Sequence, residues 1–186
     1  LGATSELPST DSPFLVVDIG GGSTEFVMGE RSVSAAISVD IGCVRMTERH
    51  FTSDPPTANQ IASTREDVNC AIDQVEEAVP IKSAKTLVAV AGTATTVAAA
   101  ALGLPDYDRD AIHGARISAE RTLEISAWLL TLTRQERAAL GYMHPGRVEV
   151  IAAGALVLAE IMKRTGAKEF IASERDILDG IVATLN

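Results

Sequence analysis

The feature that most constrains the fold is a run of three glycines, Gly20, Gly21 and Gly22, between two strand-like segments. Residues 14–18, Phe-Leu-Val-Val-Asp, form a short apolar run that predicts a buried strand, and residues 25–28 alternate as a second strand does. A glycine turn between two such segments is typical of a β-hairpin. The fold is therefore expected to begin with paired strands.

The rest of the chain predicts an α/β fold. Residues 34–39 read as a third strand, so the sheet should open with a three-strand meander. A helix carrying Arg45 follows, and Thr57 with Gln60 forms a capping box that opens another helix. The alternation of strands and helices predicts a mixed sheet with flanking helices. The further elements are expected as strands at 86–90 and 169–172, a small-residue loop at 91–96, and helices at 97–102, 118–132, 133–140, 148–165 and from 173 onward.

The composition excludes several classes of protein. Among 186 residues, 46% are hydrophobic and the net charge is −9, which argues against binding to nucleic acid or to a membrane surface. No apolar run approaches the length of a membrane span. Cys43 and Cys70 stand in unrelated contexts without a metal-binding spacing, which predicts two reduced thiols in a cytoplasmic protein.

The glycine turn has the composition of an anion-binding loop. Glycines at positions 20–22 remove every Cβ, so a ligand can approach the backbone closely. Their N–H groups, with those of Ser23 and Thr24, can converge on a phosphate, and the two hydroxyls add donors. A plain hairpin turn without a ligand remains the alternative. The spacing fits neither a Walker A loop, which needs a lysine, nor a dinucleotide-binding loop.

Carboxylates stand on both sides of this turn, Asp18 before it and Glu25 after it. Two carboxylates beside a phosphate would repel it unless a cation lay between them. Mg²⁺ takes oxygen ligands and usually binds through one or two carboxylates plus phosphate. Asp18 and Glu25 are therefore the candidate metal ligands and catalytic residues.

Residues 15–26, Leu-Val-Val-Asp-Ile-Gly-Gly-Gly-Ser-Thr-Glu-Phe, resemble the phosphate-binding signature of the exopolyphosphatase / guanosine pentaphosphate phosphohydrolase (Ppx/GppA) family. Four further segments are similar to that family in the same order. They are residues 38–48, 91–97, 145–154 and 173–180, so the resemblance spans nearly the whole chain.

The resemblance implies the actin-like ATPase (ribonuclease H-like) fold, with two α/β domains and an active site between them. Residues 1–13 would be the tail of the inter-domain segment, and residues 14–186 the second domain. The glutamate that activates water would precede Leu1, so this chain alone would be inactive. The resemblance also implies a homodimer at full length.

By the same resemblance, Asp18 and Glu25 would bind Mg²⁺, and residues Gly20 to Thr24 would bind phosphate. K⁺ is a candidate activator. The implied substrate is inorganic polyphosphate. The alternatives are guanosine pentaphosphate as the substrate, a kinase or chaperone-like ATPase on the same fold, or a module that binds nucleotide or polyphosphate without hydrolysis. A second loop, with Gly92, Thr93 and Thr95, would either line the cleft or pack a strand against a helix.

The remaining polar residues have plainer interpretations. Arg45 would either offer its guanidinium to a polyphosphate chain or pair with Glu48 at helical spacing, and the pair is expected. Arg147 would either reach phosphate or lie in the first turn of its helix, and the helix turn is expected. No carboxylate is in register with any of the three histidines at positions 50, 113 and 144, so all three are expected to be structural or on the surface.

Overall fold

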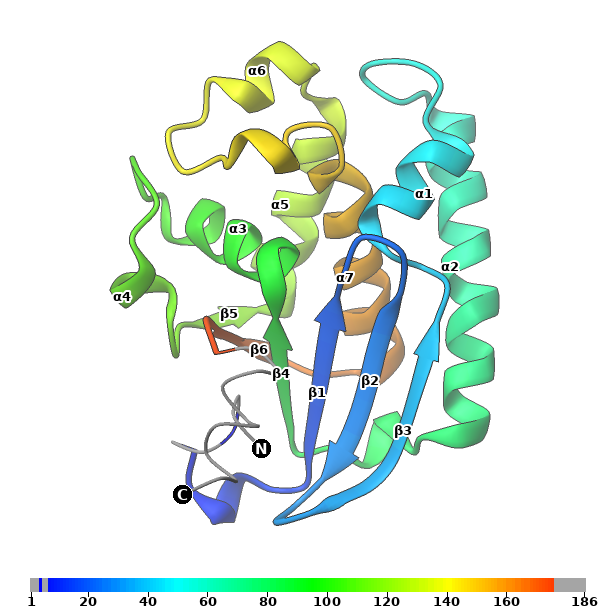
Figure 1. The fold of residues 1–186 in the computed structure, drawn as a ribbon, viewed down its shortest axis with the longest axis vertical. Coiled ribbons are helices and arrows are strands. Elements are labelled where there is room, and N and C mark those ends of the chain that lie inside the picture. Colours follow the sequence, from blue (N-terminus) through cyan, green and yellow to red (C-terminus); the bar gives the residue numbers. More distant parts are fainter. Residues whose placement is uncertain (1–3, 5–6, 176–186) are drawn as a thin grey trace.

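The computed structural model describes residue 4 and residues 7–175, and within these residues six strands form one mixed sheet (Figure 1). The strand order is β3-β2-β1-β4-β6-β5. Strands β1, β4 and β6 run parallel, and the other three pair antiparallel to their neighbours. The strands are β1 (Phe14–Ile19), β2 (Thr24–Gly29), β3 (Val33–Val39), β4 (Thr86–Val90), β5 (Arg116–Ser118) and β6 (Glu169–Ser173).

The predicted meander is confirmed. β1 pairs antiparallel with β2 from Phe14 opposite Gly29 to Ile19 opposite Thr24, and β2 pairs antiparallel with β3. The glycine turn therefore lies at the end of the hairpin where β1 finishes. The parallel strand β4 finishes at the same edge of the sheet, beside Asp18.

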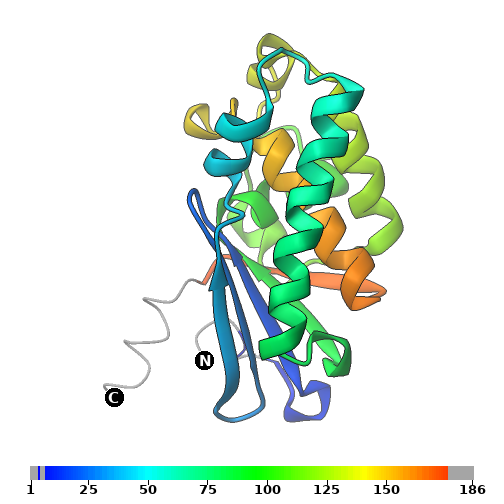
Figure 2. The ribbon, with the colours of Figure 1, turned by 90° about the vertical axis from the view of Figure 1, so that its right-hand side faces the viewer.

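Helices cover one face of the sheet (Figure 2). Most lie where the sequence predicts, but the final helix predicted from residue 173 lies almost wholly outside the described residues. No helix in the described part of the chain has the length and apolarity needed to cross a bilayer. The helices are α1 (Cys43–His50), α2 (Ala58–Ala78), α3 (Ala91–Leu102), α4 (Arg109–Ile112), α5 (Ala119–Thr131), α6 (Arg134–Ala138) and α7 (Ile151–Thr165).

At two predicted helix starts, side chains form hydrogen bonds with the backbone N–H groups that have no partner within the helix. Thr57 accepts a hydrogen bond from the Gln60 N–H while the Gln60 side chain accepts one from the Thr57 N–H, which confirms the capping box. Thr133 and Glu136 repeat the arrangement at α6. These caps fix where α2 and α6 begin.

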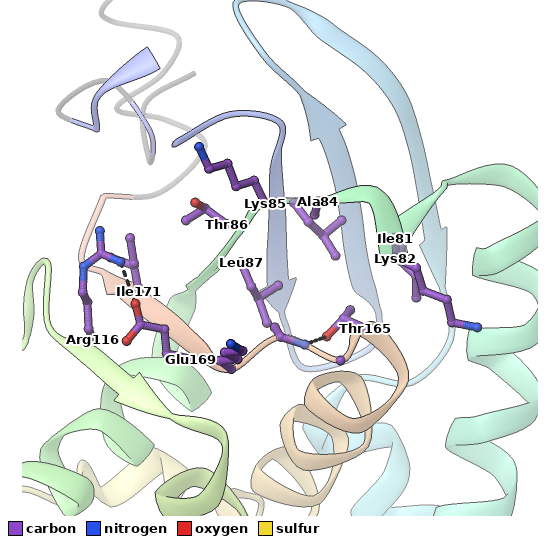
Figure 3. A pocket seen from close by; sticks show the side chains of 14 residues that line it. Ile81, Lys82, Ala84, Lys85, Thr86, Leu87, Arg116, Thr165, Glu169 and Ile171 are labelled. Carbon is purple, nitrogen blue, oxygen red and sulfur yellow. Dashed lines mark hydrogen bonds and ion pairs between the residues drawn. The ribbon is translucent and has the colours of Figure 1, made fainter. Parts of the chain in front are cut away.

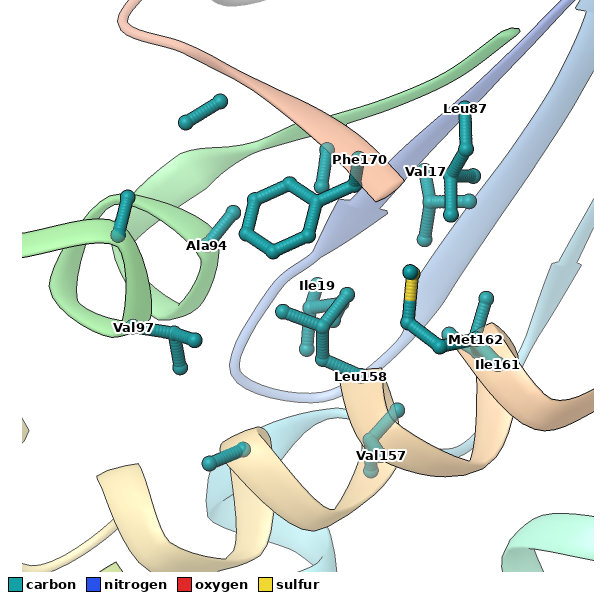
Figure 4. Close-up of a cluster of buried hydrophobic side chains, with 14 of the residues drawn as sticks. Val17, Ile19, Leu87, Ala94, Val97, Val157, Leu158, Ile161, Met162 and Phe170 are labelled. Carbon is teal, nitrogen blue, oxygen red and sulfur yellow. The ribbon is translucent and has the colours of Figure 1, made fainter. Parts of the chain in front are cut away.

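The main core lies between the sheet and α7, because alternate residues of β1 point toward this helix (Figure 4). Val17 and Ile19 of β1 are buried there together with Leu158 and Met162 of α7. Asp18, the residue between them, consequently points to the opposite face of the sheet. The apolar side chains of Phe14, Val88, Val90 and Ile171 form a smaller cluster apart from the main core.

One local prediction differs from the structure, and two short elements were not predicted. Residues 91–96 do not form a loop: α3 begins at Ala91, directly after β4. Ala91 has φ +64°, the only positive φ of a non-glycine residue in the described part of the chain, and this left-handed residue turns the strand into the helix without a connecting loop. The sequence also gave no signal for α4 or for the short edge strand β5.

Candidate phosphate-binding site

The glycine turn is closed by one hydrogen bond of its own. Gly20 N–H donates to the Ser23 carbonyl at 3.0 Å, where β1 ends and β2 begins. The N–H of Gly20, one of the predicted phosphate donors, is therefore used inside the turn.

The N-terminus of α1 lies against the carbonyl side of the turn. Cys43 N–H donates to Gly20 O at 2.9 Å, and the N–H groups of Val44 and Arg45 both donate to Gly21 O, at 2.9 and 3.1 Å. The first N–H groups of a helix have no partner within the helix. Here the carbonyls of the turn supply those partners.

Gly42 makes this close contact possible. A Cβ built on Gly42 would lie 2.3 Å from Gly21 O and 2.5 Å from the Gly22 carbonyl carbon. Gly42 N–H also donates to Gly22 O, at 3.3 Å. Only glycine fits at this position without displacing the helix from the turn.

The direction of the carbonyls sets the direction of the N–H groups. In a planar trans peptide the C=O and N–H of one unit point in opposite directions. Because the carbonyls of Gly20, Gly21 and Gly22 face α1, the N–H groups of Gly21, Gly22 and Ser23 face away from it. Within the described residues no hydrogen bond engages these three N–H groups. Successive N–H groups of this kind form an anion-binding nest.

Asp18 and Glu25 lie directly opposite each other on β1 and β2, next to the turn. Directly opposite residues of an antiparallel pair share one face of the sheet, with Cβ atoms about 5 Å apart. This is the face opposite the main core. The two carboxylates are placed together, as the sequence predicted for a metal pair.

Two serine hydroxyls orient Glu25. Ser23 Oγ and Ser38 Oγ each donate to Glu25 Oε1 at 2.6 Å. Ser38 is the residue opposite Glu25 on β3. The carboxylate is thus held from both sides, and Oε2 has none of these bonds.

Mg²⁺ fits the chemistry of this donor set. No cluster of three or more His, Cys, Asp or Glu side chains in the described part of the chain is placed to hold a metal. A cation here would depend on Asp18, Glu25 and oxygens of its ligand or of water. Mg²⁺ commonly binds with so few protein ligands.

Thr24 does not contribute its hydroxyl to the turn. Its side chain is fully buried and donates to the Ile41 carbonyl at 3.0 Å. Thr24, Phe26 and Met28 all point inward, as alternation along β2 requires. The Thr24 side chain therefore stabilises the approach of the chain to α1.

A second group of residues meets at the N-terminus of α3. A Cβ on Gly92 would lie 2.2 Å from Arg147 Nε, so the guanidinium packs directly on the Gly92 backbone. Arg147 NH1 also donates to Thr96 Oγ1 at 3.1 Å. Arg147 lies in a 3₁₀ turn, η4 (Pro145–Arg147), ahead of α7. A guanidinium and a helix N-terminus, both positive, face the same edge of the sheet as the glycine turn.

The side chains of Thr93 and Thr95 are buried, which favours packing for these two members of the predicted second loop. A Cβ on Gly154 of α7 would lie 2.6 Å from Thr93 Oγ1 and 3.0 Å from Cys43 Cβ. Helices α1, α3 and α7 therefore meet closely here. Burial raises the pKa of the Cys43 thiol, and neither Cys43 nor Cys70 forms a disulfide.

Two expectations for charged residues were wrong. Arg45 does not pair with Glu48: its Nε donates to Gly22 O at 2.7 Å, and its NH2 lies 3.3 Å from Asp40 Oδ1. The loop carbonyl and Asp40 offer it nearer partners than the next turn of its own helix.

His50 also has a carboxylate partner, contrary to expectation. His50 Nε2 lies 2.8 Å from Asp67 Oδ2, and Arg49 NH1 lies 2.5 Å from the same atom. Burial opposes ionisation of Asp67, but hydrogen bonds from His50 and Arg49 outweigh it and hold its pKa below the usual range. The cluster ties the last turn of α1 to α2 and does not contact the glycine turn.

A basic pocket of about 570 Å³ opens at the opposite end of the sheet, beside Lys85 and Lys168 (Figure 3). Arg116 in its wall pairs with Glu169 at 2.7 Å, and Lys82 pairs with Glu76 at 3.1 Å. None of the residues predicted to bind phosphate or metal lines this pocket. The candidate site is therefore the edge of the sheet that carries the glycine turn.

Sequence reasoning missed Gly42 and Ser38 as parts of this site. Gly42 stands just before a helix, where glycine is common and carries no special signal. Ser38 could have been found, because alternation along β3 places it on the face of Glu25 once the strands are paired.

Fold and site together define an α/β domain in which a glycine hairpin and two carboxylates lie at one edge of a mixed sheet. The crystal structure of an exopolyphosphatase-like protein has the same fold, with a TM-score of 0.95 and 40% sequence identity, covering 99% of this chain and 63% of that one. The fold is that of the actin-like ATPases, as the sequence predicted.

The family model described as "Ppx/GppA phosphatase family" matches residues 1–185, and the chain belongs to this family. It is 46% identical over 188 residues to exopolyphosphatase 2 of Mycobacterium tuberculosis, covering 99% of this chain and 59% of that protein. It is 39% identical over 80 residues to a guanosine-5'-triphosphate,3'-diphosphate pyrophosphatase of Photobacterium profundum, covering 42% of this chain and 16% of that protein. The chain thus spans about three fifths of the length of the mycobacterial relative.

Proposed function

We propose that the full-length protein is an exopolyphosphatase, which hydrolyses the terminal phosphoanhydride bond of inorganic polyphosphate. One observation carries the proposal: the N–H groups of Gly21, Gly22 and Ser23, which have no hydrogen-bond partner in the described part of the chain, lie beside the paired carboxylates of Asp18 and Glu25. The name of the mycobacterial relative points to the same substrate.

In this proposal the oxygens of the terminal phosphoryl group accept hydrogen bonds from the three N–H groups. Water attacks the phosphorus in line with the bridging oxygen, the P–O bond to that oxygen breaks, and the products are orthophosphate and a polyphosphate shorter by one unit. The N–H groups stabilise the charge on the equatorial oxygens. The dipole of α1, behind the turn, favours the same charge.

Asp18 and Glu25 would hold Mg²⁺, which when bound neutralises phosphate charge and polarises a phosphoryl oxygen. Ser23 and Ser38 keep Glu25 in place for that role. Without a cation the two carboxylates would repel the substrate. Chelation of Mg²⁺ should therefore remove both turnover and tight substrate binding. A separate measurement of turnover with added K⁺ tests whether K⁺ is an activator.

Arg147 would contact the second phosphate of the chain. Its guanidinium packs over Gly92 at the N-terminus of α3 and donates to Thr96. Five N–H donors on a planar group suit phosphate oxygens. Of the two roles that the sequence left open for Arg147, this is the contact with phosphate.

The group that takes the proton from water would come from a first domain preceding residues 14–186, joined to them by residues 1–13. A glutamate is the group that the family resemblance implies, and general-base catalysis needs it within hydrogen-bond reach of the water. The isolated 186-residue chain should then bind phosphate but release none from polyphosphate. Metal-dependent turnover by that chain would refute the assignment.

The decisive experiment measures orthophosphate release by the full-length protein from polyphosphate, guanosine pentaphosphate and ATP, each with Mg²⁺ and with EDTA. Release from polyphosphate alone supports the proposal. Preference for guanosine pentaphosphate would favour the second candidate, which the Photobacterium relative's name motivates. Binding without release would indicate a non-hydrolytic module. Light scattering on the same sample tests the expected homodimer.

A further inference from the structure

Arg45 contacts the glycine turn from the side opposite its free N–H groups. Its Nε donates to Gly22 O at 2.7 Å, and Asp40 holds NH2 at 3.3 Å. Because the guanidinium binds a carbonyl oxygen, it lies on the carbonyl side of the turn. That position separates it from an anion bound at the N–H groups.

The peptide unit that Arg45 holds is the one that ends in the Ser23 N–H. The Gly22 carbonyl and the Ser23 N–H belong to one planar group, so fixing one direction fixes the other. Glycine permits rotation of this unit more readily than any other residue. A rotated unit would present a carbonyl oxygen to the phosphate in place of a donor.

The other two peptide units of the turn are held differently. Gly20 O and Gly21 O accept short main-chain bonds from α1, at 2.9 to 3.1 Å. The main-chain bond to Gly22 O, from Gly42 N, is longer at 3.3 Å. The short contact to Gly22 O is the one from the Arg45 side chain, and it is also the charge-assisted one.

We propose that Arg45 is a positioning residue: it holds the Gly22 carbonyl so that the Ser23 N–H points at the bound phosphate, and it does not contact the phosphate itself. The inference rests on the proposed function, because it assigns the N–H groups to a phosphate ligand. Asp40 orients the guanidinium for this bond.

The test compares Arg45→Met with Arg49→Met in the full-length protein. Arg49 lies on the same helix and pairs with Asp67, away from the turn. Arg45→Met should lower kcat/KM for polyphosphate about ten-fold, the size of one lost charge-assisted hydrogen bond, and Arg49→Met should not. Equal kinetics for the two variants would overturn the proposal.

Amide ¹⁵N shifts of serine- and glycine-labelled protein supply the second readout. Inorganic tripolyphosphate should shift the Gly21, Gly22 and Ser23 amides in the wild type, and Arg45→Met should lose the Ser23 shift alone. If kcat/KM falls while the Ser23 shift persists, Arg45 contacts the phosphate directly and the positioning role is wrong.

The two readouts also separate this inference from the proposed function. A wild-type protein that shows the amide shifts but no phosphate release would remove the exopolyphosphatase assignment, and loss of the Ser23 shift in Arg45→Met would still support the role of Arg45. A wild-type protein whose three amides do not shift with tripolyphosphate would overturn the inference itself.

Discussion

Replacing Gly42 by alanine tests the contact between α1 and the glycine turn. The new Cβ would lie 2.3 Å from Gly21 O, whereas nonbonded heavy atoms settle about 3.5 Å apart, so helix and turn must separate by roughly 1 Å. The bond from Cys43 N to Gly20 O, now 2.9 Å, would then exceed the ~3.2 Å limit of a normal N–H···O bond. Losing three such bonds, at about 0.5–1.5 kcal/mol each, predicts a local destabilisation of roughly 2–4 kcal/mol.

Hydrogen exchange of the segment 42–46 in the full-length protein measures that loss, and phosphate release from polyphosphate measures its effect on the site. We expect kcat/KM to fall about 100-fold, as when an oriented N–H donor is removed. Gly103→Ala is the matched control. Gly103 has φ +67° and open space around it at the far end of α3, so it should lose stability without losing turnover. Wild-type exchange and turnover in Gly42→Ala would refute the described contact.

Four further substitutions test the site and the supporting ion pairs. Asp18→Ala or Glu25→Ala should lower turnover of the full-length enzyme by orders of magnitude with the circular dichroism spectrum unchanged; near-normal rates would remove both from the site. Arg147→Ala should lower kcat/KM for polyphosphate about 10- to 100-fold, the worth of a hydrogen bond to a charged group, and an unchanged value would leave Arg147 with packing alone. Asp67, with its lowered pKa, stabilises the fold above about pH 3.9, the value of a free aspartate, and that stability is lost as pH falls through the folded pKa. Asp67→Asn should therefore lower the Tm at pH 7, and the difference from wild type should shrink in acid; a pH-independent difference would contradict this.

The elements that the sequence predicted correctly are those with a local cause. Capping boxes at Thr57 and Thr133 mark helix starts because the hydrogen bonds join residues three apart. The meander followed from apolar runs around the glycine turn. The prediction of a loop at 91–96 was wrong. Glycine and threonine have low helix propensity, but close packing against α7 at Gly154 favours a helix of small residues there.

The contacts that could not be predicted join segments that are distant in the sequence. His50 and Asp67 lie on two helices, and Arg45 reaches back to Gly22 across the end of the sheet. No periodicity encodes such pairs. Thr24 is different: its hydroxyl was expected to be a donor to phosphate, but the inward alternation of Phe26 and Met28 could have predicted its burial.

The first turn of α1 gives its N–H groups to carbonyls of the hairpin, so these N–H groups are not available to a ligand. Its field acts through one layer of peptide groups, each polarised by the bond behind it. A substitution in the first turn of α1 should therefore change the affinity for an anion that binds on the other side of the hairpin. Variants selected for altered substrate affinity should therefore include changes on α1 as well as in the turn.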